Sequence, residues 1–178
     1  MFDYTSFSHG QIKSKLWLAE KIEKFSLGND IVVLGSWYNL TAFVLKSRGV
    51  SGKITGIDID PKVKPIADKI CDLWLIDGTV ENITGDAKNI TVPYNTIINC
   101  SSEHMSTEWF DNIDDGTLVC IQSSNITDPN DPWFITTASP TIESFKEKYK
   151  CSAVLDCDTL RIQYGDWGYD RYMLIGIK

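Results

Sequence analysis

The chain has 178 residues, a formal net charge of −7 and a pI near 4.8, and hydrophobic residues make up 43% of it. This length fits a single domain over residues 1–178, able to bury roughly two-thirds of its unfolded surface. The acidic balance disfavours a nucleic-acid partner, which usually requires a basic face, and no apolar run reaches the ~20 residues of a membrane span.

The cysteines and the first residues together indicate a cytoplasmic protein. Residues 1–10 show no basic leader followed by an apolar core, as an export signal would. The five cysteines are odd in number and form no Cys-x-x-Cys pair, which is typical of reduced thiols. Only His9 and His104 are available as imidazole ligands, and neither lies near a cysteine pair, so we expect no metal site.

The first predicted elements are a helix and then a buried strand. Apolar residues recur at helical spacing over residues 14–25, and we expect residues 1–29 to form an arm and helix that pack on a ligand cleft. Next, the apolar residues 31–34 end in Gly35, and a helical pattern opens at Asn39. A buried strand that feeds a helix through a glycine turn is the first unit of a doubly wound α/β sheet.

Strand and helix patterns then alternate along the rest of the chain. Strands are predicted at residues 53–58, 82–88, 94–100 and 117–122, and helices at residues 61–71, 107–113 and 142–149. Residues 73–76 fit either a strand or the end of the element before them. Two β-rich runs, residues 159–164 and 171–177, form a closing hairpin. The order predicts an α/β fold with a doubly wound, mostly parallel sheet of about seven strands, helices on both faces and a C-terminal antiparallel hairpin.

Residues 123–140 hold three prolines and little periodicity, so we expect a lid or binding loop there. Aromatic residues of the later loops are candidates for lining a substrate pocket. The pairs Trp133 with Phe134 and Trp167 with Tyr169 are the better candidates, whereas Trp109, at helical spacing, is expected in the core.

Polar residues cluster where the predicted strands end, which is where open parallel sheets bind ligands. These clusters are residues 35–38, 58–60, 85–87 and 99–104. Asp58 follows Gly35 by 23 positions, close to the ~20-residue offset at which an acid meets a ribose diol. The alternative is that Asp58 and Asp60 only cap the next helix.

On these residues the chain resembles the class I S-adenosylmethionine-dependent methyltransferases, and within them the short members found in bacteriophages. The resemblance covers the chain from about Asp30 to its end. It implies S-adenosylmethionine as the cofactor, with Asp58 on the ribose, Asp86 on the adenine, and the segment from Asn99 to Ser102 beside the methionine part. The implied cofactor-binding residues are Gly35, Ser36, Trp37, Tyr38, Asp58, Ile59, Asp60, Asp86, Ala87, Asn99, Ser101 and Ser102.

The first loop departs from the family pattern. The family places three glycines there so that the backbone can approach the cofactor, but this chain keeps Gly35 alone and carries Trp37 and Tyr38. These rings either flank the ligand or pack in the interior. The missing glycines count more heavily against a nicotinamide-dependent enzyme, because the pyrophosphate of that cofactor binds against a loop with three glycines.

His104 and Glu103 are the candidate general acid and base, because a histidine suits proton removal from a methyl-accepting nucleophile. The alternative is that Glu103 caps the following helix and His104 is hydrogen-bonded in place. The sequence thus predicts a methyltransferase for a small-molecule or protein substrate. The second reading is a non-catalytic S-adenosylmethionine-binding or protein-interaction module. The sequence leaves the oligomeric state open.

Overall fold

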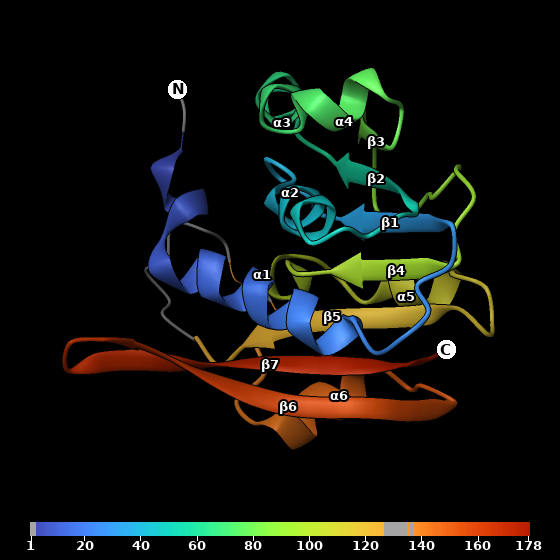
Figure 1. The fold of residues 1–178 in the computed structure, drawn as a ribbon. Helices are drawn as coiled ribbons and strands as arrows, with labels where there is room; N and C mark the ends of the chain where they lie inside the picture. Colours follow the sequence, from blue (N-terminus) through green and yellow to red (C-terminus); the bar gives the residue numbers. More distant parts are fainter. Residues whose placement is uncertain (1–2, 127–134, 136) are drawn as a thin grey trace.

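The computed structural model describes residues 3–126, 135 and 137–178. Seven strands form one sheet in the order β3-β2-β1-β4-β5-β7-β6 (Figure 1). They are β1 (Asp30–Leu34), β2 (Lys53–Asp58), β3 (Val80–Thr84), β4 (Thr96–Asn99), β5 (Leu118–Ser124), β6 (Ala153–Tyr164) and β7 (Trp167–Ile177). The first five strands pair in parallel, and β7 runs antiparallel between β5 and β6. The predicted doubly wound sheet with a closing hairpin is confirmed.

Helices cover both faces of the sheet. They are η1 (Tyr4–Phe7), α1 (His9–Ile22), α2 (Leu40–Ser47), α3 (Lys64–Ile70), α4 (Asp72–Ile76), η2 (Ser102–His104), α5 (Glu108–Asn112) and α6 (Ile142–Lys148). The first four α-helices share one apolar cluster, and α5 and α6 belong to the other. The part of the chain that the structure describes has no helix both long and apolar enough to cross a membrane.

Each central strand supplies side chains to both apolar layers in alternation. In β1, Ile31 and Val33 face the α1–α2 layer, whereas Val32 and Leu34 face the α5–α6 layer. Successive side chains of a strand point to opposite faces, so a strand covered on both sides must be apolar throughout. Trp109 of α5 is only 1% exposed, which confirms its expected place in the core.

Several element boundaries differ from those predicted. Helix α1 begins at His9, five residues before the predicted start, because the Ser8 hydroxyl accepts a hydrogen bond from the Gln11 N–H and caps the helix. Residues 73–76, which fitted two readings, lie in helix α4. The third strand starts at Val80 rather than at residue 82, and the turn of the hairpin is only residues 165–166.

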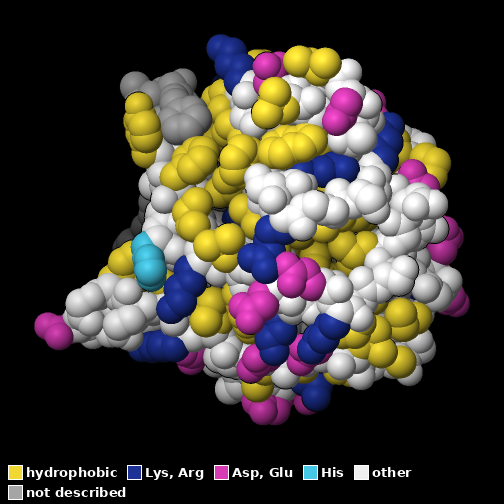
Figure 2. Space-filling model, in the orientation of Figure 1, with side chains coloured by type: hydrophobic (Ala, Val, Ile, Leu, Met, Phe, Trp, Pro, Cys, Tyr) yellow, Lys and Arg dark blue, Asp and Glu magenta, His cyan; other side chains and the backbone are white. Residues whose placement is uncertain are grey.

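Ion pairs also connect helix α1 to strand β6 of the C-terminal hairpin. The Lys21 ammonium lies 2.7 Å from an Asp158 carboxylate oxygen and 3.4 Å from one of Asp156. Figure 2 shows basic and acidic side chains interspersed on this face of the molecule. The contact fixes α1 across the lower half of the sheet in Figure 1, so its first turns reach the carboxyl ends of the strands.

Candidate functional site

A cavity of about 700 Å³ opens at the carboxyl ends of the parallel strands. Its wall is built from the first loop (residues 35–39), the ends of β2 and β3, the segment that follows β4, the amino-terminal arm with α1, and β7. This volume falls within the range of small-molecule and cofactor sites. The location agrees with the rule that open α/β sheets bind ligands outside the carboxyl ends of their strands.

The first loop is held close to β2 by its backbone. The Ser36 N–H donates to the Ile57 carbonyl at 3.0 Å, and the Trp37 N–H donates to Asp58 Oδ2 at 2.7 Å. Gly35 has a φ of +55°, and a Cβ there would lie 3.0 Å from Ser101 Cβ. The loop therefore keeps its single glycine at a position where the backbone conformation strains any other residue.

The loop lacks the other two glycines of the family pattern, and asparagine side chains hold its backbone in place instead. Asn39, with a φ of +50°, caps α2 by accepting from the Ala42 N–H. Its amide also donates to Asn82 Oδ1 at 2.7 Å, and the Asn82 amide donates to Asp68 at 2.9 Å. Asn39 is fully buried. This network fixes the loop against β2 and β3 from behind the cavity.

Asp58 lies at the end of β2 with its carboxylate at the cavity wall. Oδ1 accepts from the Asp60 N–H at 3.0 Å, and Oδ2 accepts from Trp37. The helix-capping alternative is wrong, because α3 has Val63 as its N-cap and no side-chain capping bond. Burial raises the pKa of Asp58, and the two N–H donors act against this rise. Each oxygen keeps one further lone pair for a ligand hydroxyl.

The remaining predicted cofactor residues divide between the cavity and the structure behind it. Ile59, Asp86, Ala87, Trp37, Tyr38 and Ser101 line the cavity together with Gly35 and Ser36. Asn99 and Ser102 are buried behind the wall, where the Asn99 amide donates to Met105 Sδ and the Ser102 hydroxyl donates to the Gln122 carbonyl. Asp60 borders a smaller adjacent hollow instead, and its carboxylate accepts from the Lys62 N–H.

The two aromatic residues of the first loop behave differently. Tyr38 is 3% exposed, and its hydroxyl accepts a hydrogen bond from the Asp3 N–H at 2.9 Å. Trp37 is half-buried, with its ring 5.2 Å from that of Tyr38. Tyr38 thus packs and ties the amino-terminal arm to the loop, whereas Trp37 leaves part of its ring at the cavity.

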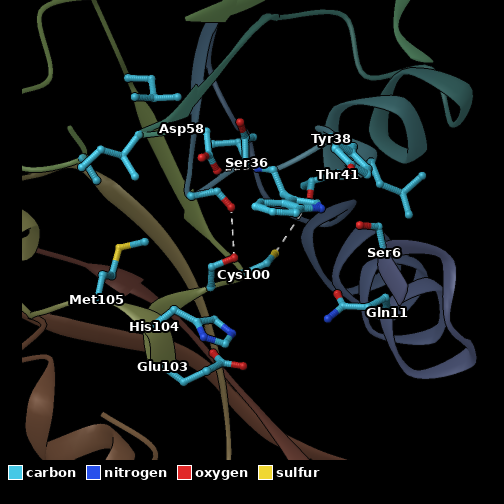
Figure 3. Close-up of a pocket in the computed structure, with 18 of the residues that line it drawn as sticks. Ser6, Gln11, Ser36, Tyr38, Thr41, Asp58, Cys100, Glu103, His104 and Met105 are labelled. Carbon is cyan, nitrogen blue, oxygen red and sulfur yellow. Dashed lines mark hydrogen bonds between the residues drawn. The ribbon is translucent and has the colours of Figure 1, made fainter. Parts of the chain in front are cut away.

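The proposed acid and base lie in different environments, although they are adjacent in η2. Glu103 is buried and forms an ion pair with the buried guanidinium of Arg171. His104 is exposed at the cavity wall. Figure 3 shows both side chains below Cys100, with Asp58 and Ser36 above it. The His104 imidazole is exposed at the cavity wall, whereas the Glu103 carboxylate is buried against a cationic partner.

Sequence reasoning missed three cationic residues that line this cavity, Lys15, Lys88 and Arg171. Lys15 lies on α1, where its ammonium donates to Gln11 Oε1 at 2.7 Å, and burial lowers its pKa to about 8. Arg171 follows Asp170 in β7 and begins a run of buried residues that extends to Gly176. A charged residue next to a long apolar run in a strand often has a buried partner, and this was the available signal for Arg171.

The later aromatic residues are only partly gathered at the site. Tyr169 lines the cavity, as do Ile126 and Ile135 at either side of the long connection. Trp167, at the hairpin tip, is 56% exposed and is not part of the cavity wall. The candidates Trp133 and Phe134, and half of the expected lid at residues 123–140, lie outside the described residues.

Comparisons with known proteins give structural matches only. No family model matches the sequence, and no curated protein matches it. Geranyl diphosphate C-methyltransferase from Streptomyces coelicolor A3(2), solved with Mg²⁺, geranyl diphosphate and S-adenosyl-L-homocysteine, superposes with a TM-score of 0.71 at 8% identity, over 94% of this chain and 78% of that one.

Two further solved structures match this chain over most of its length. Magnesium protoporphyrin IX methyltransferase from Synechocystis PCC 6803, with bound SAM, matches with a TM-score of 0.60 at 13% identity, over 93% of this chain and 77% of that one. The [4+2]-cyclase SpnF matches with a TM-score of 0.68 at 13% identity, over 95% and 81%. The chain therefore has the Rossmann-like fold of the class I S-adenosylmethionine-dependent methyltransferases, as the sequence resemblance implied.

Proposed function

We propose that this protein is an S-adenosylmethionine-dependent methyltransferase acting on a small molecule. The observation that carries the proposal is the position of Asp58, a half-buried carboxylate at the end of β2, on the wall of a cavity of cofactor size. The solved neighbours support the same cofactor, because their structures contain SAM, S-adenosyl-L-homocysteine or sinefungin.

The residues present fit an adenosine cofactor. The two Asp58 oxygens, each already fixed by one backbone N–H, accept the two ribose hydroxyls with their remaining lone pairs. Asp86 and Ala87, on the turn after β3, lie where the adenine would rest, and Ile59 offers an apolar surface beside it. Gly35, Ser36 and Ser101 border the central part of the cavity, where the methionine part would lie.

When bound, the cofactor supplies an activated methyl group on a sulfonium. The chain contributes mainly by holding the acceptor in line with that group and by excluding water from the cavity. His104 would take the proton of an acceptor that carries one, since it stands at the wall with an exposed ring. Glu103 is better suited to fixing Arg171 than to exchanging a proton.

Calorimetric titration with S-adenosylhomocysteine tests the proposal directly. We expect saturable binding at a stoichiometry of one, together with a rise in the melting temperature. Absence of both heat and thermal shift at millimolar ligand would contradict the proposed function.

A non-catalytic S-adenosylmethionine-binding or protein-interaction module is the second candidate. The first loop favours it, because Trp37 and Asn39 occupy left-handed backbone positions that glycines would hold without strain. A neighbour described as a cyclase also shares the fold, so the fold alone does not fix the reaction. Transfer of a radiolabelled methyl group into cell extract by the wild-type protein, and its loss in His104→Ala, would separate the enzyme from the binding module.

A further inference from the structure

The cavity has two chemically different ends. Asp58 and Asp86 lie at the ends of β2 and β3, where the proposed function places the adenosine. Lys15, Glu103 and Arg171 lie on the other side, over β4, β5 and β7. Since β1 stands between β2 and β4 in the sheet, the first loop separates the two ends. The second end is the part of the cavity left for the methyl acceptor.

Arg171 and Glu103 form the floor of this second end and are incompletely satisfied. The side chain of each is 4% exposed. The guanidinium donates to one Glu103 oxygen and to the Cys100 carbonyl. Among the described residues, however, Arg171 Nε and Glu103 Oε2 have no hydrogen-bond partner. A buried donor without a partner is costly, so an anion that reaches this floor gains by accepting a hydrogen bond from Arg171 Nε.

Lys15 adds an uncompensated positive charge above this floor. Its ammonium donates to the neutral Gln11 amide and forms no ion pair within residues 3–126, 135 and 137–178. Two cations, Lys15 and Arg171, thus face one carboxylate, Glu103, which leaves a net charge of about +1 at neutral pH. Burial lowers the pKa of Lys15 to about 8, and a bound anion would raise it again.

We propose that the methyl acceptor is a small organic acid whose carboxylate binds Lys15 at this end of the cavity, beside Arg171. This inference rests on the proposed function. The single net positive charge suits a monoanion, whereas a phosphate dianion would leave a negative charge in a half-buried site. Tyr169 of β7, Ile126 after β5, and Ile135 also line the cavity, so the acid carries an apolar or aromatic body.

Benzoate and phenylacetate are suitable probes, and benzamide and phenylacetamide are their uncharged counterparts. Each probe is titrated at pH 7 into the 178-residue protein, with and without saturating S-adenosylhomocysteine, and binding is followed by amide NMR shifts. We expect both acids to bind in the presence of S-adenosylhomocysteine and the amides to bind at least about tenfold more weakly. Lys15→Gln should weaken the acids about tenfold and leave S-adenosylhomocysteine affinity unchanged.

Lys13→Gln is the matched control, because Lys13 lies on the same helix but donates to the Arg161 carbonyl outside the cavity. It should leave acid binding unchanged. Equal binding of acids and amides, no binding of the acids at tens of millimolar, or no effect of Lys15→Gln would overturn the inference. Competition between the acids and S-adenosylhomocysteine would also overturn it, since Lys15 would then hold the carboxylate of the cofactor.

The same titrations separate this inference from the proposed function. If S-adenosylhomocysteine does not bind but the acids bind through Lys15, the cofactor assignment fails and the anion site stands on its own. If S-adenosylhomocysteine binds but the acids do not, the methyltransferase proposal stands and the acceptor is not an acid of this class.

Discussion

The Trp37 backbone N–H donates to Asp58 Oδ2 across 2.7 Å, so the first loop and the acid at the end of β2 form one unit. Trp37 and Asn39 adopt φ values of +49° and +50°, a conformation that costs roughly 1–2 kcal/mol for a residue other than glycine. The hydrogen bonds of Asp58 and Asn39 offset this cost. Hydrogen bonds, rather than additional glycines, therefore hold the loop in its position at the cavity.

Asp58→Asn tests the acid at the centre of this unit. The amide replaces one carboxylate oxygen by a donor and removes the charge, so two charge-assisted hydrogen bonds to the ribose would be weakened or lost. We expect S-adenosylhomocysteine affinity to fall by about 10- to 100-fold, or about 1.4–2.8 kcal/mol, in calorimetry. Asp115→Asn is the control, because Asp115 is 96% exposed in the turn before β5. Equal affinity in wild type and Asp58→Asn would show that another acid binds the ribose.

Asn39→Ala should destabilise the fold and not only the site. It removes the cap of α2, leaves the Asn82 carbonyl oxygen without its donor, and places an alanine at a φ of +50°. Together these effects predict a loss of about 2–4 kcal/mol in the free energy of unfolding, measured in urea. Asn39→Gly avoids the backbone strain and should lose about 1 kcal/mol less.

The control for this measurement is Asn112→Ala. Asn112 is exposed, and its side-chain amide donates to the Lys88 carbonyl. Its loss should stay within about 0.5 kcal/mol. If Asn39→Ala is equally mild, the asparagine network does not hold the first loop.

The fold and one half of the cavity could be predicted from the sequence, because their signals are local. Apolar runs that end in polar residues identify β1 and β2, and the end of β2 brings Asp58 to the site. The start of α1 was not predicted, although Ser8 and Gln11 have the spacing of a capping box. Gly10, in the first turn of that helix, obscured the pattern.

The other half of the cavity could not be predicted, because it depends on contacts between distant segments. Helix α1 has a glycine at position 10 because a Cβ there would lie 2.5 Å from the hydroxyl of Tyr169, a residue 159 positions away in the sequence. Lys15 and Arg171 likewise meet only after α1 has packed across β7. No spacing within the sequence indicates that a lysine of the first helix and an arginine of the last strand share a cavity.

The ion pair between Glu103 and Arg171 gives a third prediction. Arg171→Met leaves the buried Glu103 carboxylate without its cation, which should cost about 3–5 kcal/mol in the free energy of unfolding. The double variant Glu103→Gln with Arg171→Met removes both charges and should recover a large part of that loss. Urea unfolding of the two single variants and the double variant completes the cycle. Additive losses would mean that the two side chains do not interact energetically.

Lys15 should make stability depend on pH in a defined direction. Burial lowers its pKa to about 8 from 10.5, so between these values the unfolded chain binds more protons and stability rises with pH. Below pH 8 the folded protein holds Lys15 in its charged form, and the burial of that charge lowers the free energy of unfolding by its full amount.

The variant Lys15→Met removes this buried charge. We expect Lys15→Met to be more stable than wild type at pH 7, and this advantage to shrink by about 2–3 kcal/mol by pH 10. Glu103, Arg171 and Cys100 face Lys15, and the Lys15 cation lowers the pKa of Cys100, which burial raises. Urea unfolding at four pH values measures this difference in stability, with Lys13→Met, on the same helix but outside the cavity, as the control. A pH-independent difference for Lys15→Met would mean that the folded protein does not lower the lysine pKa.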